Sequence, residues 1–254
     1  MNSTPAYKQH LTCTFINSLL LASTLLLTAC GGSSSNSNSS SKNSSNGDCT
    51  PEKNNVTFTL NADKTSAEMN GVIDCTITEK VSKLLENKTL TTIVMKDVPG
   101  SADDEKNLAA AGKVHEAGLN IHLDGKIASG GVDFFLAGTV RTIADNSIVA
   151  VHSWADGSGV QGIELYSRNP DDKTHQEYIK YFQKVGFTEQ EATDFYVYTL
   201  RAADADHTHC MSAEELRQYK VVTGDQLDGT TELNPTTEDN EEYCNSYINQ
   251  PVPM

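Results

Sequence analysis

Apolar and polar positions change along the chain in a way that predicts strands and helices in turn. Short apolar runs bounded by turn residues predict strands, and longer stretches with apolar residues at helical spacing predict helices. The expected strands are at residues 56–60, 71–73 and 90–95 and within residues 146–152, where a turn comes first, and the expected helices are at residues 77–85, 103–118, 175–185 and 189–202. Because strands and helices alternate, we expect an α/β fold with a parallel β-sheet core and flanking helices.

The two ends of the chain differ from this core in composition, which divides the sequence into four parts. Residues 1–29 have the pattern of a signal peptide, and residues 30–55 are rich in Ser, Asn and Gly, as in a flexible linker. The α/β domain is expected at residues 56–224. Residues 225–254 form an acidic tail that contains proline.

The amino end predicts export and attachment to a membrane. Lys8 and His10 precede an apolar region that ends in Leu27-Thr28-Ala29-Cys30. This ending resembles a bacterial lipobox, in which the cysteine, here Cys30, is acylated and becomes the new first residue. Gly31 follows instead of a retention aspartate, so we expect a lipid anchor in the bacterial cell envelope, at the outer membrane facing the periplasm. An uncleaved anchor or an ordinary secretory signal is the alternative.

Charge excludes one class of partner and cysteine content indicates the redox environment. The 254 residues carry a formal net charge of −15, which would repel phosphate backbones and excludes nucleic acid as a partner. Besides Cys13 and Cys30, the chain has Cys49, Cys75, Cys210 and Cys244. In an oxidising compartment these four predict two disulfides, and the three pairings stay open, as do free buried thiols.

Residues 127–154 hold the candidate chemistry. Ser129 stands before Gly130 and Gly131, at the amino end of an apolar segment that predicts a buried helix. Unpaired N–H groups at such a position can hold the oxyanion formed when serine attacks a carbonyl. His152 ends the last expected strand, which would deliver it into a cleft as the base. The alternatives are that Ser129 only forms a turn and that His152 is a structural residue that makes hydrogen bonds. A cysteine nucleophile is less favoured, because no cysteine has a comparable turn around it.

At this point the sequence resembles the Clp-type serine proteases of the ClpP/crotonase superfamily, particularly their periplasmic Clp-like branch. The resemblance lies in several short motifs that occur in the family's order, at Ala128–Gly131, Ala137-Gly138, Asn146–His152, Val98–Ser101 and Met211–Leu216. It spans roughly residues 71–224, and Val221-Val222 resembles the family's closing strand. The loop at Val98–Ser101 lacks one glycine of the family pattern. The resemblance implies a Clp-like fold, and self-association is an implication of the same kind.

The resemblance also implies residue roles. Ser129 would be the nucleophile and His152 the base, with backbone N–H groups of Gly100, Ser101 and Gly130 as the oxyanion hole. The family's acid precedes the helix that starts near Ser212, where this chain offers Asp204 and Asp206. We predict Asp206, which is nearer to that helix.

Two metal-binding alternatives share this acidic segment. Positions one, three, five, nine and twelve of an EF-hand-like calcium loop are matched, although a histidine occupies the position that needs glycine. The matching residues are Asp204, Asp206, Thr208, Ser212 and Glu215. His207, His209 and Cys210 could instead bind zinc together with an acid.

The sequence therefore predicts a lipid-anchored periplasmic Clp-like serine hydrolase, most simply a peptidase, acting on a peptide or another acyl substrate. Its Ser-His-Asp mechanism needs no metal or organic cofactor. A catalytically inactive envelope lipoprotein that binds or scaffolds through the same fold is the alternative from another class. A third alternative is acyl-CoA chemistry of the crotonase kind. The expected export makes it less favoured, because CoA is not expected in that compartment.

Overall fold

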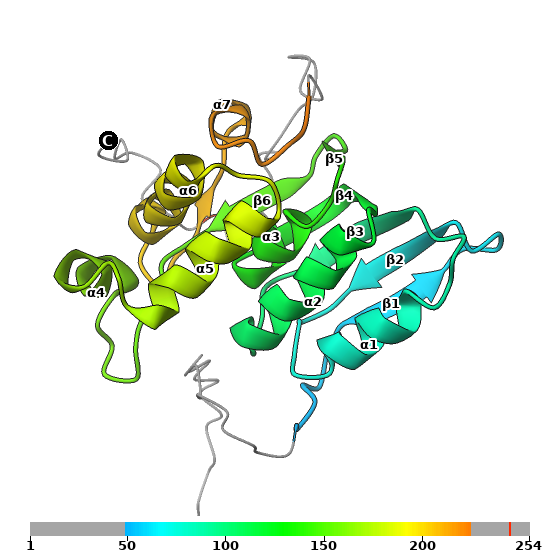
Figure 1. Ribbon diagram of the computed structural model, residues 1–254, viewed down its shortest axis with the longest axis horizontal. Helices are drawn as coiled ribbons and strands as arrows, with labels where there is room; N and C mark the ends of the chain where they lie inside the picture. Colours follow the sequence, from blue (N-terminus) through cyan, green and yellow to red (C-terminus); the bar gives the residue numbers. More distant parts are fainter. Residues whose placement is uncertain (1–48, 225–243, 245–254) are drawn as a thin grey trace, which may run out of the picture. The chain divides into compact units, whose positions relative to one another are not determined.

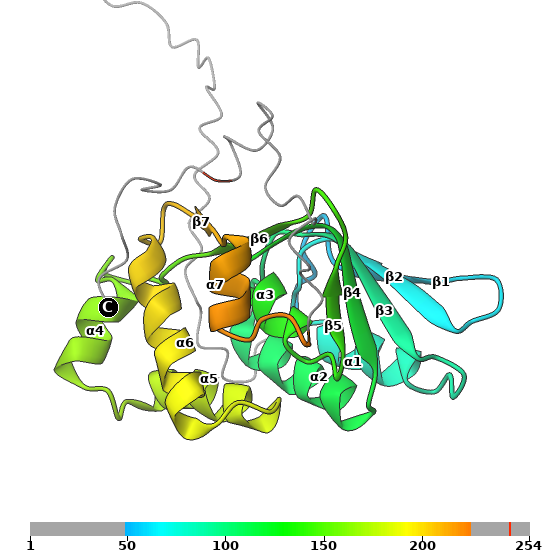
Figure 2. The ribbon, with the colours of Figure 1, turned by 90° about the horizontal axis from the view of Figure 1, so that it is seen from above.

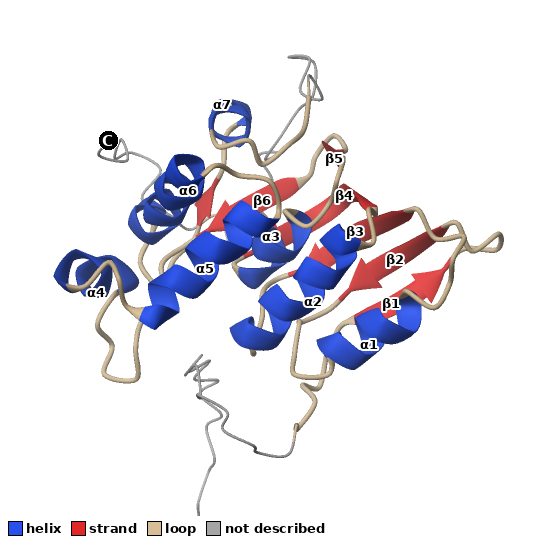
Figure 3. Ribbon diagram, in the orientation of Figure 1, coloured by secondary structure: helices blue, strands red, loops and turns tan. Residues whose placement is uncertain are grey.

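Seven strands of the described residues form one sheet in the computed structural model, which describes residues 49–224 and residue 244 (Figures 1 and 3). All of these residues belong to the unit Ser39–Met254. The strands are β1 (Thr57–Leu60), β2 (Ser66–Asn70), β3 (Thr92–Val98), β4 (Asn120–Ala128), β5 (Arg141–Ile143), β6 (Ile148–Val151) and β7 (His209–Cys210). The helices are α1 (Ile77–Leu84), α2 (Asp104–Glu116), α3 (Gly130–Phe135), α4 (Gly162–Arg168), α5 (Lys173–Lys184), α6 (Glu189–Ala202) and α7 (Ala213–Gln218).

The sheet is parallel in its interior and antiparallel at both edges. Its order is β1-β2-β3-β4-β6-β7, with β5 also paired to β4. The strands from β2 to β6 pair in parallel, whereas β1 pairs with β2 and β7 with β6 in antiparallel fashion. The predicted fold class, an α/β fold with a parallel sheet core and flanking helices, is confirmed.

Strand β4 is long enough to pair with two strands along one edge. Ile121–Leu123 pair with β5, and Lys126–Ala128 pair with β6. Ala128, the last residue of β4, is paired with Ala150 in β6. The chain therefore leaves these two neighbouring parallel strands at the same end of the sheet, where Ser129 and His152 follow.

One face of the sheet holds the apolar core. The buried side chains alternate along the strands, as in Ala67 and Met69 of β2 or Ile121 and Leu123 of β4. Helices α1, α2 and α3 lie over this face in both ribbon views (Figures 1 and 2). The opposite face is more polar and includes the ion pair between Lys96 and Asp124.

Several helices begin where capping residues predict. Asp103 accepts a hydrogen bond from the Lys106 N–H at the start of α2. Helix α6 begins with a capping box at Thr188, and α7 with another at Ser212, so the helix expected around Met211–Leu216 is confirmed.

Two expected strands are wrong. The strand expected at residues 71–73 is replaced by β2 immediately before it, because Gly71 turns the chain with a φ of 103°. Val222 and its buried neighbour Val221 lie in a loop, where the Val221 carbonyl accepts a hydrogen bond from the Arg141 guanidinium instead of joining a ladder.

Two disulfides join the flanks of the domain to its core, as the cysteine count predicted. Cys49 pairs with Cys75, just before α1, across 26 residues, and Cys210 in β7 pairs with Cys244 across 34 residues. This resolves the pairing that the sequence left open, and each bond fixes one flank beside the sheet.

The other predictions for the two ends of the chain concern residues that the structure does not describe. The expected signal peptide (1–29), Cys13, Cys30 and most of the linker and tail lie outside the described residues. Among the described helices, none has the length and apolar character required to cross a membrane.

Candidate active site

Ser129 occupies a strained turn between β4 and α3. Its backbone has φ 51° and ψ −128°, a combination that glycine adopts readily and that costs other residues about 1–3 kcal/mol. The Ser129 N–H donates to the Ala150 carbonyl of β6, and its carbonyl accepts from the Val132 N–H. The neighbouring strand and the first helical turn therefore hold this conformation in place.

The glycines after Ser129 allow α3 to approach the loop that follows β3. A Cβ on Gly130 would lie 2.1 Å from the Ser101 hydroxyl, and one on Gly131 would lie 2.3 Å from the Val98 carbonyl. Gly100 in that loop is also close to the serine, because a Cβ on Gly100 would lie 3.8 Å from the Ser129 hydroxyl. The structure thus brings the predicted oxyanion loop and the predicted nucleophile together.

Backbone donors are available around this hydroxyl. Gly130 opens the first turn of α3, where N–H groups have no intrahelical acceptor. Within residues 49–224, the N–H groups of Gly100 and Ser101 also donate to no protein acceptor. The loop itself is fixed, because the Gly100 carbonyl accepts from the Ile73 N–H and the Ala102 N–H donates to the Ile73 carbonyl. All the predicted oxyanion donors therefore lie in one rigid region.

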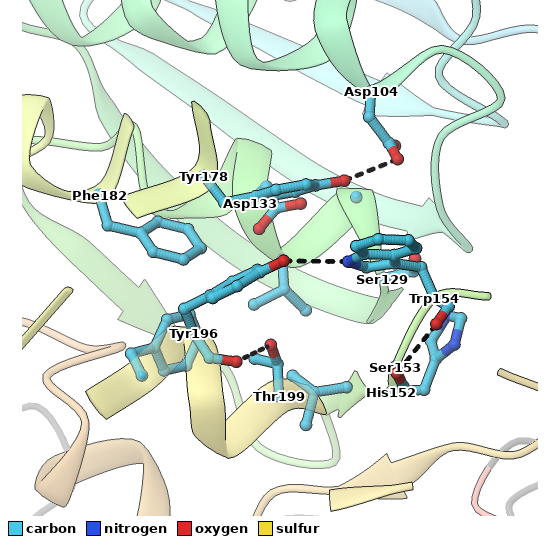
Figure 4. Close-up of a pocket in the computed structure, with 14 residues that line it drawn as sticks. Asp104, Ser129, Asp133, His152, Ser153, Trp154, Tyr178, Phe182, Tyr196 and Thr199 are labelled. Carbon is cyan, nitrogen blue, oxygen red and sulfur yellow. Dashed lines mark hydrogen bonds between the residues drawn. The ribbon is translucent and has the colours of Figure 1, made fainter. Parts of the chain in front are cut away.

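His152 lines the same cavity as Ser129 (Figure 4). Its Nδ1 atom is buried and has no hydrogen-bond partner among the described residues. Burial lowers the pKa of His152 because it penalises the imidazolium, while the Ser153 backbone and the charges of Asp104 and Asp204 act in the opposite direction. The imidazole is therefore neutral at neutral pH, the form that can accept a proton.

The cavity has a volume of about 50 Å³ and lies between the start of α3, the end of β6 and helices α5 and α6. Such a space holds a small chemical group or a few water molecules. Its walls are largely aromatic, formed by Trp154, Tyr178, Phe182, Phe195 and Tyr196. Tyr178 and Phe182 of α5 pack with the apolar core and also face this cavity.

Two carboxyl groups that the sequence analysis did not single out also line the cavity. Asp104 accepts hydrogen bonds from the Ser101 hydroxyl and, at 2.7 Å, from the Tyr178 hydroxyl (Figure 4). Burial raises the pKa of Asp133 well above its usual range, and the charge of Asp104 raises it further. Asp104 belongs to none of the motifs in the sequence, and Asp133 lies just after the glycine pair. The two residues are far apart in the chain, and only the packing of α2 against α3 brings them together.

A buried network supports the aromatic wall. The Trp154 indole N–H donates to the Tyr196 hydroxyl at 3.1 Å, and that hydroxyl lies 2.7 Å from His175 Nδ1. Because the indole is only a donor, the Tyr196 proton is left to donate to His175. His175 is 1% exposed, and burial lowers its pKa, which favours the neutral ring that accepts this bond.

The structure does not bring Asp206 to the cavity. Asp206 is exposed, whereas Asp204 is half-buried and its charge acts on His152. The Asp204 carboxylate also accepts from the Asp206 N–H and contacts His207. Sequence spacing favoured Asp206, but the tight turn at residues 204–207 places its neighbour nearer the imidazole.

The metal-binding alternatives lose their ligands to other contacts. Cys210 is in a disulfide, and His209 bonds to the Glu215 carboxylate. Burial alone would raise the pKa of Glu215, but hydrogen bonds from His209 and the Ser212 N–H lower it to about 2. Among residues 49–224 and 244, no three His, Cys, Asp or Glu side chains converge on a point where they could hold a metal ion.

Comparisons with known proteins give structural similarities alone. No protein family model and no curated protein matches the sequence. One similar solved structure is an enoyl-CoA hydratase from Polaromonas sp. JS666, 10% identical with a TM-score of 0.39, over 69% of this chain and 74% of that one. Another is an enoyl-CoA hydratase/carnithine racemase from Magnetospirillum magneticum, 11% identical with a TM-score of 0.40, over 68% of this chain and 70% of that one.

Proposed function

We propose that the protein is a serine hydrolase that cleaves peptides or related acyl compounds, with Ser129 as nucleophile and His152 as base. The observation that carries the proposal is the strained backbone of Ser129 in the turn between β4 and α3. Ser129 lines the same cavity as His152, whose lowered pKa favours the neutral imidazole. Serine nucleophiles on unrelated folds are presented by strained turns of this kind. A serine in an ordinary turn has no need of such a conformation.

The proposed reaction proceeds in two acyl transfers. The Ser129 hydroxyl oxygen attacks the substrate carbonyl while His152 takes its proton, and the oxyanion receives hydrogen bonds from N–H groups of Gly130 and of Gly100 or Ser101. The C–N or C–O bond then breaks, and His152 returns the proton to the leaving group. Water, deprotonated by His152, releases the acid from Ser129.

In this proposal a carboxylate from the loop at residues 204–207 orients His152. Asp206 is the acid predicted from the sequence, and Asp204 is the neighbouring carboxylate whose charge acts on the imidazole. The unpaired Nδ1 atom is the position such an acid would satisfy.

A fluorophosphonate probe tests the nucleophile directly. The purified domain from residue 31 onward is treated with the probe, and the adduct is located by peptide mass spectrometry. We expect labelling at Ser129 that is absent in Ser129→Ala and strongly reduced in His152→Ala. Ser153, which lines the same cavity, provides a matched control, since Ser153→Ala should keep the label. Labelling of another serine, or of none in a folded sample, would overturn the proposal.

A catalytically silent binding module is the second candidate. The observation that favours it is the lack of any hydrogen-bonded acid at His152 Nδ1 in the described residues. It predicts a folded protein in which Ser129 stays unlabelled. Tight binding of an acyl thioester by such an unlabelled protein would point instead to acyl-CoA chemistry.

We also propose that the protein is attached to the outer membrane of a bacterial envelope through lipid on Cys30. The support is the lipobox-like ending Leu27-Thr28-Ala29-Cys30 after an apolar region. Expression of the full chain with labelled palmitate tests this. Incorporation that disappears in Cys30→Ser but persists in Cys13→Ser supports lipidation, and a soluble, unlabelled product contradicts it.

A further inference from the structure

Two carboxyl groups, and no lysine or arginine of the described residues, line the cavity beside Ser129. The two carboxyl groups belong to Asp104 and Asp133. Asp104 is satisfied by the hydroxyl groups of Ser101 and Tyr178. The Asp133 carboxyl group has no hydrogen bond to any described residue, although its backbone carbonyl accepts one from Tyr181.

Ionisation of both carboxyl groups in this cavity is electrostatically unfavourable. Burial and the nearby charge of Asp104 both raise the pKa of Asp133, so the second carboxylate is destabilised. The same two charges also raise the pKa values of Tyr178 and Tyr196, after burial itself. A group that carries a positive charge into the cavity would remove this repulsion and supply Asp133 with the donor it lacks.

The walls of the cavity suit a cation of one kind. Trp154, Tyr178 and Tyr196 surround the space next to Asp133 (Figure 4). Aromatic faces attract ammonium groups, most strongly where water is excluded. With a volume of about 50 Å³, the cavity is of a size to hold the end of a slender side chain, such as a primary ammonium group on a methylene chain.

We propose that this cavity is a specificity subsite for a primary alkylammonium group, such as a lysine side chain, bound by Asp133 and Asp104 between the aromatic rings. The subsite rests on the proposed function, because Ser129 and His152 line the same cavity and would act on the carbonyl of the residue whose side chain enters it. The substrate class would then be peptides or esters of lysine-like residues.

Paired substrates test the subsite through turnover. The thiobenzyl esters of Nα-protected lysine and norleucine share a four-carbon side chain and differ in the ammonium group. We expect wild-type kcat/KM to be at least about tenfold higher for the lysine ester, the scale of a charge-assisted contact supported by aromatic faces. Asp133→Asn should remove most of that preference, and Asp145→Asn, at an exposed site outside the cavity, should keep it. Equal rates, or a preference for norleucine, in the wild type would overturn the subsite.

Binding without turnover separates the subsite from the catalytic proposal. Ser129→Ala is titrated with n-butylammonium chloride and with 1-butanol, followed by NMR chemical-shift changes of the Trp154 indole. Saturable shifts with butylammonium alone, lost on adding Asp133→Asn, support the subsite even if neither ester is hydrolysed. Hydrolysis of both esters without preference, and no shifts, would overturn the subsite while leaving the hydrolase standing. Asp104→Asn serves as a second variant if Asp133→Asn does not fold, because its amide oxygen can still accept from Tyr178.

Discussion

At the scale of single residues, Ser129 shows how a functional position departs from local preference. Its φ of 51° and ψ of −128° would suit glycine, yet the chain has serine there, between a strand and a glycine pair. The hydrogen bond from its N–H to Ala150 and the packing of α3 hold the conformation. Strain of this kind persists where the surrounding structure over-determines the backbone.

Replacing Ser129 by glycine should therefore stabilise the fold relative to replacing it by alanine. Alanine keeps the strain, whereas glycine relieves it, and the gain exceeds the entropy that glycine adds to the unfolded chain. We expect Ser129→Gly to unfold with a free energy about 1 kcal/mol higher than Ser129→Ala in urea titrations. Equal stability of the two variants would show that the backbone carries no strain at this position.

His152 determines the acid side of the expected pH profile. Its pKa lies below the ordinary value because burial disfavours the imidazolium, so the neutral base should persist at mildly acidic pH. We expect kcat/KM for ester hydrolysis to stay constant as the pH is lowered to about 6.5, and to decrease only at lower pH.

Asp204→Asn should shift that acid limb to lower pH, because removing a negative charge near His152 further destabilises the imidazolium. The exposed Asp206 offers the matched comparison, and Asp206→Asn should shift the limb less. A limb above pH 6.5 would contradict the lowered pKa of His152, and a larger shift with Asp206→Asn would assign the orienting role to Asp206, as the sequence predicts.

At the scale of elements, the close contact between α3 and the end of β3 positions the candidate site. Gly131 makes it possible, since a Cβ there would lie 2.3 Å from the Val98 carbonyl. Backbone atoms cannot give way as a flexible side chain can. A methyl group at this position would thus push α3, and Ser129 with it, away from the loop at Gly100.

Gly131→Ala should consequently be among the most disruptive small substitutions, with a loss of about 3 kcal/mol or more in unfolding free energy. Gly157→Ala is its control, because nothing lies within 4 Å of a Cβ there. Thermal denaturation followed by circular dichroism distinguishes them. If both variants melt like the wild type, the approach of α3 to β3 is looser than the structure indicates.

The elements also differ in how far local pattern predicts them. Helices α5 and α6 have apolar residues at helical spacing and clear capping residues, and both lie where the sequence predicts. Strand β2 (SAEMN) was missed, because three of its five residues are polar and face away from the core. Its strand conformation depends on pairing with β1 and β3 on either side.

At the scale of the whole described chain, two disulfides fix the flanks to the sheet. Cys210 belongs to β7, whose neighbour β6 delivers His152, and Cys244 packs near Ala128 and Ala150. Closing loops of this length stabilises a protein by constraining its unfolded chain. The second disulfide should therefore support the strand that carries the candidate base.

Replacing both Cys210 and Cys244 by alanine should lower the unfolding free energy by about 3 kcal/mol. We expect the Cys49/Cys75 double variant to lose a similar amount, since the two loops span 34 and 26 residues. Urea titration measures both losses. Fluorophosphonate labelling of Ser129 should decrease more in the Cys210/Cys244 variant than in the Cys49/Cys75 variant. Equal labelling of the two variants would show that the Cys210–Cys244 disulfide does not support the candidate site.

By itself, the sequence determined the alternation of strands and helices, the order of the motifs and the candidate pair Ser129 and His152, because periodicity and turn chemistry are local properties. Only the tertiary structure decided the cysteine pairing, the position of Asp204 relative to His152, and the meeting of Asp104 with Asp133 in one aromatic cavity. These features join residues far apart in the chain, and their distances are fixed by how parallel strands pair and how helices pack across them.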